Sequence, residues 1–559
     1  MRWTAFPVAA AAVLIAACNK TSAPPAGSPA PIADAAAVPH YQGLGDHKRK
    51  VTTASPEAQQ YFDQGLAFLF AFNHDEAIRS FKRATELDPA CAMAYWAISL
   101  ANGPHINFPL VPPDRATAAW DALTKAQANA AKGTDTERAL IEALAARYAS
   151  PQPADRAPLD AAYADAMRKV WAAHPDDADV GALFAESMMD LRPWNLFTHD
   201  KKAEPGTEEV LQTLQAVLKV DPTHPLANHL YIHALEMSPT PELAVEAADR
   251  LRTLQPAMGH NVHMPSHIDV LLGHWAKAAS QNEAAIVADT EFRKVAPKKQ
   301  GFYRVYMAHN QHMLTFAAMM QGRKERSLSA IKQMVADIPE DWIKENALMV
   351  DGFVGAPYEV MLRFGAWDDV LAAPEPAEYL PLSRSLRHYA RGVAYAAQGK
   401  TKEARDEQKL FVEAKSKIPA ESTMSNSPSS AIAEVAASVL EGEISYREGK
   451  VDAGLKALRE GVVKEDALHY DEPPTWIQPV RHALGAALLQ AGKFKEAEQV
   501  YREDLKVRPE NGWSLYGLTR ALKAQKKNDE AAATESRFND AWRDADIKLS
   551  SSCLCLPGV

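Results

Sequence analysis

The chain has 559 residues, of which 47% are hydrophobic and 24% charged, and its formal net charge is −10. A chain of this length and composition can bury a large core. Double-stranded DNA is held through many Lys and Arg contacts to phosphate, and the sequence contains no basic stripe long enough to supply them. We therefore expect no nucleic-acid partner.

The amino-terminal segment has the layout of a secretory signal. Arg2 precedes an apolar run from Ala5 to Ala17 that is too short to span a bilayer. The ending Ile15-Ala16-Ala17-Cys18 resembles a bacterial lipobox, which implies that residues 1–17 are removed and that Cys18 carries the lipid. By the same resemblance, Asn19 favours the outer membrane, facing the periplasm. An uncleaved anchor helix is the alternative.

Residues 18–50 are predicted to contain the lipidated cysteine and a disordered tether. Ala, Pro, Ser and Gly dominate this stretch, and it has few large apolar side chains that could pack. The lipid would then be the only attachment of the protein to the membrane.

Small, aromatic and helix-ending residues recur at the spacings of the tetratricopeptide helix hairpin. The first set is Tyr61, Gly65, Phe68, Ala77, Phe81, Ala84 and Pro89. The second is Leu484, Gly485, Leu488, Ala497, Tyr501 and Pro509, followed by Trp513 and Gly517. Small residues let two antiparallel helices approach closely, aromatic residues fill the space between hairpins, and proline ends the second helix.

These patterns predict an all-α fold, a tetratricopeptide-like solenoid of helix hairpins wound into a right-handed superhelix. Alternating β-branched runs are absent, while apolar residues at helical spacing fill stretches such as 139–148. The segment from Ala372 to Pro381 interrupts the pattern, so we predict two blocks, residues 51–372 and 382–545. Residues 546–559 are predicted to form an unpacked tail. In that tail, Cys553 and Cys555 are expected to pair with each other or stay unpaired, rather than bind a soft metal.

Histidines gather in one part of the chain. Of the 18 histidines, nine fall between residues 224 and 312, at positions 224, 229, 233, 260, 263, 267, 274, 309 and 312. His229 and His233 recur 34 residues later as His263 and His267, which is the tetratricopeptide period. The two pairs are therefore predicted to occupy equivalent places on neighbouring repeats and to face the concave groove of the solenoid. Taken singly, any of these histidines could instead be a capping or core residue.

The spacing of these residues predicts a metal site. Glu236 shares a helical face with His229 and His233, and the next unit would add His309 and His312. Packed helices lie about 8 to 10 Å apart, so side chains of adjacent helices can bind one ion. Pro265 disfavours helix at the preceding residue, which predicts His263 on an entry loop and His267 in the first helical turn.

Imidazole and carboxylate ligands suit zinc, copper, iron or nickel, and the sequence does not choose among them. A catalytic ion would keep a position open for water, with Glu236 as ligand or general base. Four further residues, His260, Tyr470, Glu472 and Trp476, are predicted to line a ligand groove. For the last three, an ordinary Pro-rich loop with buried aromatics is the alternative.

The repeats are similar to the tetratricopeptide superfamily over most of the chain, and with Cys18 they resemble tetratricopeptide lipoproteins of the bacterial cell envelope. This resemblance implies a scaffold that binds a protein or peptide partner in the envelope, and it does not imply an enzyme. The histidine pattern leaves two functions open. One is a binding scaffold that holds a metal ion in its groove, and the other is a metal-dependent enzyme, hydrolytic or oxidative, that uses the same ion.

Overall fold

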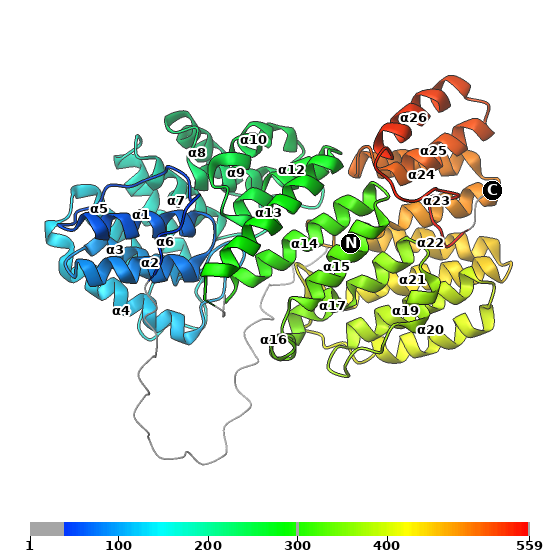
Figure 1. The fold of residues 1–559 in the computed structure, drawn as a ribbon, viewed down its shortest axis with the longest axis horizontal. Coiled ribbons are helices and arrows are strands. Elements are labelled where there is room, and N and C mark those ends of the chain that lie inside the picture. The colour runs from blue at the N-terminus through cyan, green and yellow to red at the C-terminus, as the bar shows by residue number, and fades with distance from the viewer. Residues whose placement is uncertain (1–37, 298–300, 557–559) are drawn as a thin grey trace, which may run out of the picture. The chain divides into compact units, whose positions relative to one another are not determined.

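The computed structural model describes residues 38–297 and 301–556, and helices account for nearly all of the regular structure there (Figure 1). The predicted all-α fold is confirmed. Among the described residues, strands are limited to an antiparallel pair, β1 (Thr423–Met424) and β2 (Ser427–Pro428). Within the two described ranges, no helix is long and apolar enough to cross a membrane. The predicted signal peptide and Cys18 lie outside the described residues.

The chain forms two compact units. Unit 1 contains His47–Pro193 and the described residues before Gly43, and unit 2 contains Gly43–Asp46 together with the chain from Trp194 onward. This division differs from the two predicted blocks. The predicted interruption at Ala372 to Pro381 lies inside unit 2, where it connects one helix to the next.

Unit 1 is built from helices joined by short turns and by two longer loops, between α3 and α4 and between α5 and α6. They are α1 (Pro56–Phe70), α2 (His74–Leu87), α3 (Ala92–Ala101), α4 (Pro113–Asn129), the 3-10 helix η1 (Ala130–Lys132), α5 (Asp135–Ala145), α6 (Ala157–Ala173) and α7 (Ala178–Met189). The α1–α2 hairpin shows why the sequence needs a small residue at Gly65. A Cβ atom at that position would lie 2.5 Å from Phe81 Cε1, so the two helices can approach this closely only at glycine.

The prediction of a disordered tether is wrong for residues 38–50. Tyr41 donates its backbone N–H to Gln64 Oε1 at 3.0 Å, and Arg49 Nη1 lies 2.8 Å from both Asp177 Oδ1 and Asp179 Oδ2. These side chains give the segment specific partners, which its overall Ala- and Pro-rich composition does not reveal.

Unit 2 begins its regular structure at α8 and continues to α26. Its first helices are α8 (Thr207–Val220), α9 (Pro225–Glu236), η2 (Pro241–Ala244), α10 (Val245–Leu254), α11 (Gly259–His263), α12 (Pro265–Leu271), α13 (Trp275–Val295), α14 (Tyr303–Met320), α15 (Lys324–Ala336) and α16 (Glu340–Glu345). The later ones are α17 (Ala347–Arg363), α18 (Trp367–Ala372), α19 (Pro381–Ala397), α20 (Thr401–Lys415), α21 (Ser429–Arg447), α22 (Val451–Asp466), α23 (Val480–Gln490), α24 (Phe494–Val507), α25 (Gly512–Ala524) and α26 (Asn528–Ala541).

The second predicted repeat set lies on α23, α24 and α25. Tyr501 of α24 fills the space between Gly485 of α23 and Gly517 of α25, because a Cβ at either glycine would lie within 2.4 Å of Tyr501 Cζ. The ring is fully buried. The pairing of small and aromatic residues that the repeat pattern predicts is therefore present in the packed helices.

The prediction of an unpacked tail is wrong for residues 551–556. Ser552, Cys553, Cys555 and Leu556 are buried, and Cys553 is joined to Cys555 by a disulfide. Ser552 Oγ donates to the backbone oxygen of His482 at 3.0 Å. The tail packs because its side chains are uncharged: some are apolar, and the Ser552 hydroxyl has hydrogen-bond partners.

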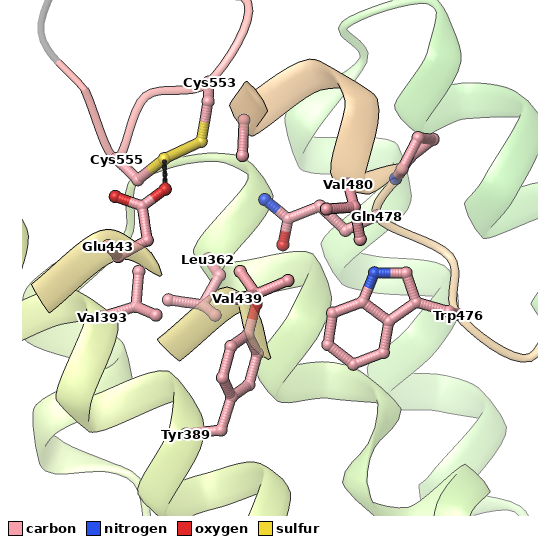
Figure 2. A pocket seen from close by; sticks show the side chains of 12 residues that line it. Leu362, Tyr389, Val393, Val439, Glu443, Trp476, Gln478, Val480, Cys553 and Cys555 are labelled. Carbon is pink, nitrogen blue, oxygen red and sulfur yellow. Dashed lines mark hydrogen bonds between the residues drawn. A yellow bond between two sulfur atoms is a disulfide. The ribbon is translucent and has the colours of Figure 1, made fainter. Parts of the chain in front are cut away.

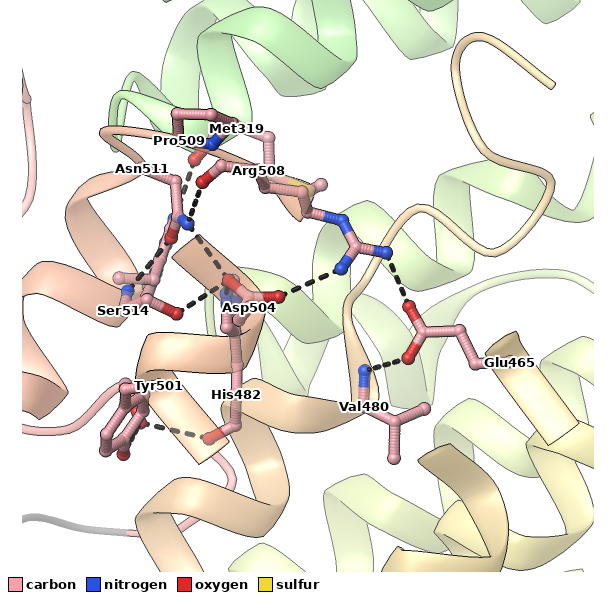
Figure 3. Close-up of polar contacts among 12 residues, drawn as sticks. Met319, Glu465, Val480, His482, Tyr501, Asp504, Arg508, Pro509, Asn511 and Ser514 are labelled. Carbon is pink, nitrogen blue, oxygen red and sulfur yellow. Dashed lines mark hydrogen bonds and ion pairs between the residues drawn. The ribbon is translucent and has the colours of Figure 1, made fainter. Parts of the chain in front are cut away.

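A buried polar network links α22, α23, α24 and the N-terminus of α25 (Figure 3). His482 Nε2 donates to Asp504 Oδ2 at 2.9 Å, and Arg508 connects Asp504 to Glu465 at 2.9 and 2.7 Å. Asn511 Nδ2 donates to the same Asp504 oxygen at 3.0 Å. A buried carboxylate with this many donors is stable without water.

Candidate metal centre

Four helices of unit 2 carry the clustered histidines. His229 and His233 lie on α9, His260 and His263 on α11, and His267 on α12. His309 lies on α14. Pro225 opens α9 at a position where a helix needs no N–H, and His224 Nδ1 accepts the backbone N–H of Ala227 at 3.1 Å.

The prediction that His263 lies on an entry loop is wrong. His263 ends α11, Met264 has helical dihedral angles, and Pro265 opens α12 directly afterwards. Proline is tolerated there because the first turn of a helix has no carbonyl partner for its N–H groups. His263 and His267 therefore keep their helical spacing of four residues, and their Nε2 atoms lie 2.8 Å apart.

The six imidazoles form two groups of three. The first triad is His229, His233 and His260, and the second triad is His263, His267 and His309. Within each triad, one ligand atom from each residue lies within 4.8 Å of the others. Five of the six residues are buried, and His309 is partly exposed. The predicted open groove is therefore wrong for this site, which is an interior one.

Glu236 joins the two triads. His233 Nδ1 donates to Glu236 Oε1 at 2.9 Å, and His267 Nδ1 lies 2.7 Å from Glu236 Oε2. Both rings thus use Nδ1 for the carboxylate, and Nε2 of His267 faces His263 Nε2 at 2.8 Å. His233 Nε2 is buried and has no hydrogen-bond partner. This is the arrangement in which a carboxylate orients metal-binding histidines.

Asn282 of α13 fixes the tautomer of His263. Its amide nitrogen donates to the backbone oxygen of Ala278 at 2.8 Å, so its Oδ1 faces His263 Nδ1 at 2.7 Å and accepts a hydrogen bond. His263 Nε2 then carries a lone pair, directed at His267 Nε2. Two nitrogens bound at right angles to one ion, with bonds of about 2.0–2.1 Å, would lie roughly 2.9 Å apart.

Burial controls the charge of these imidazoles. It lowers the pKa of His260, His263 and His309 well below the usual histidine range, and the neighbouring rings lower it further. Burial also disfavours charge on His267, but the carboxylates of Glu236 and Glu472 outweigh it and raise the pKa of His267 to about 10. Without an ion, His267 is therefore protonated, and its imidazolium is the cation that faces Glu236.

A segment far along the chain completes the surroundings of His267. Glu472 Oε2 lies 3.4 Å from His267 Nδ1, and Tyr470 donates its hydroxyl to Glu472 Oε1 at 2.6 Å. Burial raises the pKa of Glu472 to about 7. Tyr470 and Glu472 were predicted to line a ligand groove, but no pattern in the sequence indicates that they lie beside the clustered histidines.

Two of the predicted site residues lie elsewhere. His312 is outside both triads, and its ring packs edge-on against Phe353 with centroids 5.6 Å apart. Trp476 lines a different pocket of unit 2, with Tyr389 and the Cys553–Cys555 disulfide (Figure 2). His260, predicted only as a groove residue, instead belongs to the first triad. It was missed as a ligand because it has no counterpart one repeat earlier.

Comparison with known proteins identifies one repeat family. Residues 58–91 match the tetratricopeptide repeat family model. No curated protein matches the chain significantly.

Several solved structures are similar at low sequence identity. One chain in the structure of the APC/C hetero-tetramer Cut9–Hcn1 is 15% identical to this chain, with a TM-score of 0.31. The match covers 83% of this chain and 76% of the other. The human IFIT1 dimer with m7Gppp-AAAA is 12% identical, with a TM-score of 0.32, over 89% and 92%. Yeast Tom70 is 9% identical, with a TM-score of 0.28, over 85% and 90%. The chain is all-α, and its residues 58–91 match the model of a tetratricopeptide repeat.

Proposed function

We propose that this protein is a cell-envelope tetratricopeptide scaffold that holds a transition metal in the interior of unit 2. The observation that carries the proposal is that six imidazoles form two triads, and that the ligand atoms within each triad lie within 4.8 Å of one another. Buried polar groups are ordinarily hydrogen-bonded, and the bare Nε2 of His233 is costly unless it binds something. A metal ion would supply that partner.

The ligand chemistry narrows the ion to a class. Neutral imidazoles with carboxylates in support suit zinc, copper, iron or nickel, and no free thiolate takes part in either triad. A calcium or magnesium ion is disfavoured, because those ions take oxygen ligands.

The test is metal analysis of the purified chain from Cys18 onward, compared with a variant carrying His229→Ala, His233→Ala, His263→Ala and His267→Ala. We expect bound metal in the parent protein and none in the variant. Loss of metal with an unchanged melting temperature would indicate a functional ion, and loss of both a structural ion. The control is His388→Ala, a histidine paired with Glu407 at 2.7 Å away from the centre. A metal-free parent protein that cannot be loaded would refute the proposal.

The scaffold and envelope parts of the proposal rest on the sequence and the repeat. Tetratricopeptide hairpins commonly bind peptides or proteins, and Cys18 stands in a lipobox-like sequence. We propose outer-membrane anchoring through that cysteine. Cys18→Ser should move the protein from the membrane fraction to the soluble periplasmic fraction. Retention of the variant on the membrane would contradict lipid anchoring.

A metal-dependent enzyme is the second candidate. Three protein ligands per ion leave a coordination position open, which is the usual arrangement of catalytic rather than structural sites. Glu236 then orients His233 and His267 and is not the general base, because both of its oxygens already face imidazoles.

A further inference from the structure

We propose that the centre holds two metal ions, one in each triad, with a small anion bound between them. This inference rests on the proposed metal function and specifies its stoichiometry and its ligand class. The ligand would be a small oxygen- or nitrogen-donor anion, of which hydroxide and azide are the simplest members.

Each triad by itself offers three imidazoles that lie close enough together to bind one ion. In the first triad, the ring centroids of His229 lie 5.0 Å from His233 and 4.9 Å from His260. In the second triad, His263 lies 4.8 Å from His267 and 4.5 Å from His309. With metal–nitrogen bonds of about 2.0–2.1 Å, nitrogens on one ion can be at most roughly 4.2 Å apart, so small side-chain rotations would close either triad on an ion.

The two triads form a single centre. The rings of His233 and His267 are 5.5 Å apart, and those of His260 and His263 are 5.9 Å apart. One ligand of each triad is hydrogen-bonded or ion-paired to the same carboxylate, Glu236. Two-metal sites in proteins have ions about 3.5–4 Å apart, a spacing that adjacent triads of this kind can provide.

Charge balance requires the anion. Two divalent ions bring four positive charges into a buried site whose six ligands are neutral imidazoles. The nearby carboxylates, Glu236 and Glu472, supply at most two negative charges. Unbalanced charge in a low-dielectric interior is costly. A small anion that occupies the open position of both ions reduces that charge and completes both coordination shells.

The test uses Cu²⁺ and azide as probes on the metal-stripped mature chain. We expect two Cu²⁺ per chain, and an electron paramagnetic resonance signal that integrates to far fewer than two spins, because adjacent bridged ions couple. Azide should bind once per pair of ions and add a charge-transfer absorption band.

Single-site variants separate the two ions. His229→Ala and His309→Ala should each bind one Cu²⁺ and recover a full one-spin signal. The matched control is His312→Ala, on the same helix as His309 and outside both triads, which should retain two coupled ions. Circular dichroism checks that each variant is folded, and the stoichiometry of the parent protein does not depend on the variants.

The outcomes separate this inference from the proposed function. One ion per chain overturns the two-ion centre and leaves the metal function standing. No ion overturns both. Two ions with two full, independent spins and no azide band overturn the shared anion and show two separate sites.

Discussion

At the residue scale, Glu236 has the most consequential position in unit 2. Its two oxygens face imidazoles from different repeats, His233 at 2.9 Å and His267 at 2.7 Å. Burial alone would raise the pKa of Glu236, but His267 and His233 lower it to about 2, so the group is an anion. An anion at this place makes both rings better metal ligands, because it accepts their Nδ1–H groups.

Glu236→Gln should weaken metal binding by about 10- to 100-fold, since the amide keeps the size of the side chain but loses its charge. Competition against a chelator of known affinity measures the effect. Glu407→Gln is the control, because Glu407 pairs with His388 at 2.7 Å in the same way outside the centre. Equal affinities in the two variants would contradict the role of Glu236.

His482 gives a pH-dependent prediction. Burial lowers its pKa to about 4 although Asp504 opposes the shift, and the ring accepts a hydrogen bond from Arg363 Nη2 at 2.8 Å. The folded pKa is thus below the unfolded value of about 6.5, so the unfolded state takes up the proton first as the pH falls. The stabilisation is present above pH 6.5 and is lost between about pH 6.5 and 4.

Between pH 7 and pH 5, His482 should account for about 2 kcal/mol of lost unfolding free energy. His482→Gln should show a correspondingly smaller difference between its urea unfolding curves at the two pH values. The same pH dependence in the variant as in the parent protein would show that His482 does not titrate in this way.

Part of the candidate metal centre could be predicted from the sequence. The four-residue spacing and the 34-residue recurrence of His229, His233, His263 and His267 are local properties, and the structure brings these residues together. The position of Glu472 beside His267 depends on long-range packing, which no local pattern encodes.

At the element scale, the hairpins follow from close contacts between small and aromatic residues. These contacts are predictable because glycine and tyrosine must stand at fixed offsets for two helices to approach. The continuation from α11 to α12 was not predictable. The rule that the residue before proline avoids helix is a statistical one, and packing against α13 and α14 overrides it at Met264.

Gly485→Ala should destabilise unit 2 by about 1–3 kcal/mol, because its Cβ would lie 2.4 Å from Tyr501 Cζ in a filled core. Chemical denaturation measures the change. Gly461→Ala on α22 is the comparison, since its Cβ would first meet Val480 Cγ1 at 3.2 Å and alanine favours helix. We expect that variant to stay within about 1 kcal/mol of the parent protein. Similar losses in both would refute the packing explanation.

At the scale of the whole molecule, unit 2 draws on distant parts of the sequence. Gly43 accepts a hydrogen bond from the backbone of Ala257 at 3.0 Å, and the backbone oxygen of Ser552 accepts one from Arg363 at 3.2 Å. Composition predicted both terminal segments to be unpacked, because it averages over the few residues that make these contacts. The boundary between the units likewise depends on contacts rather than on the repeat pattern.

Deletion of residues 551–559 should lower the stability of unit 2 by about 2–4 kcal/mol, the loss of a few buried hydrogen bonds and of packed apolar surface. Thermal unfolding tests this. An unchanged melting temperature would show that the buried tail contributes no stability.

The partial exposure of His309 has a kinetic consequence for the whole molecule. The other five imidazoles are sealed in the interior, so exchange of a bound ion with bulk solution must pass this ring or wait for a local opening of the helices. Dissociation would then be slow at neutral pH however modest the affinity is. Changing the bulk of the side chains beside His309 would alter the residence time of the ion more than its equilibrium constant.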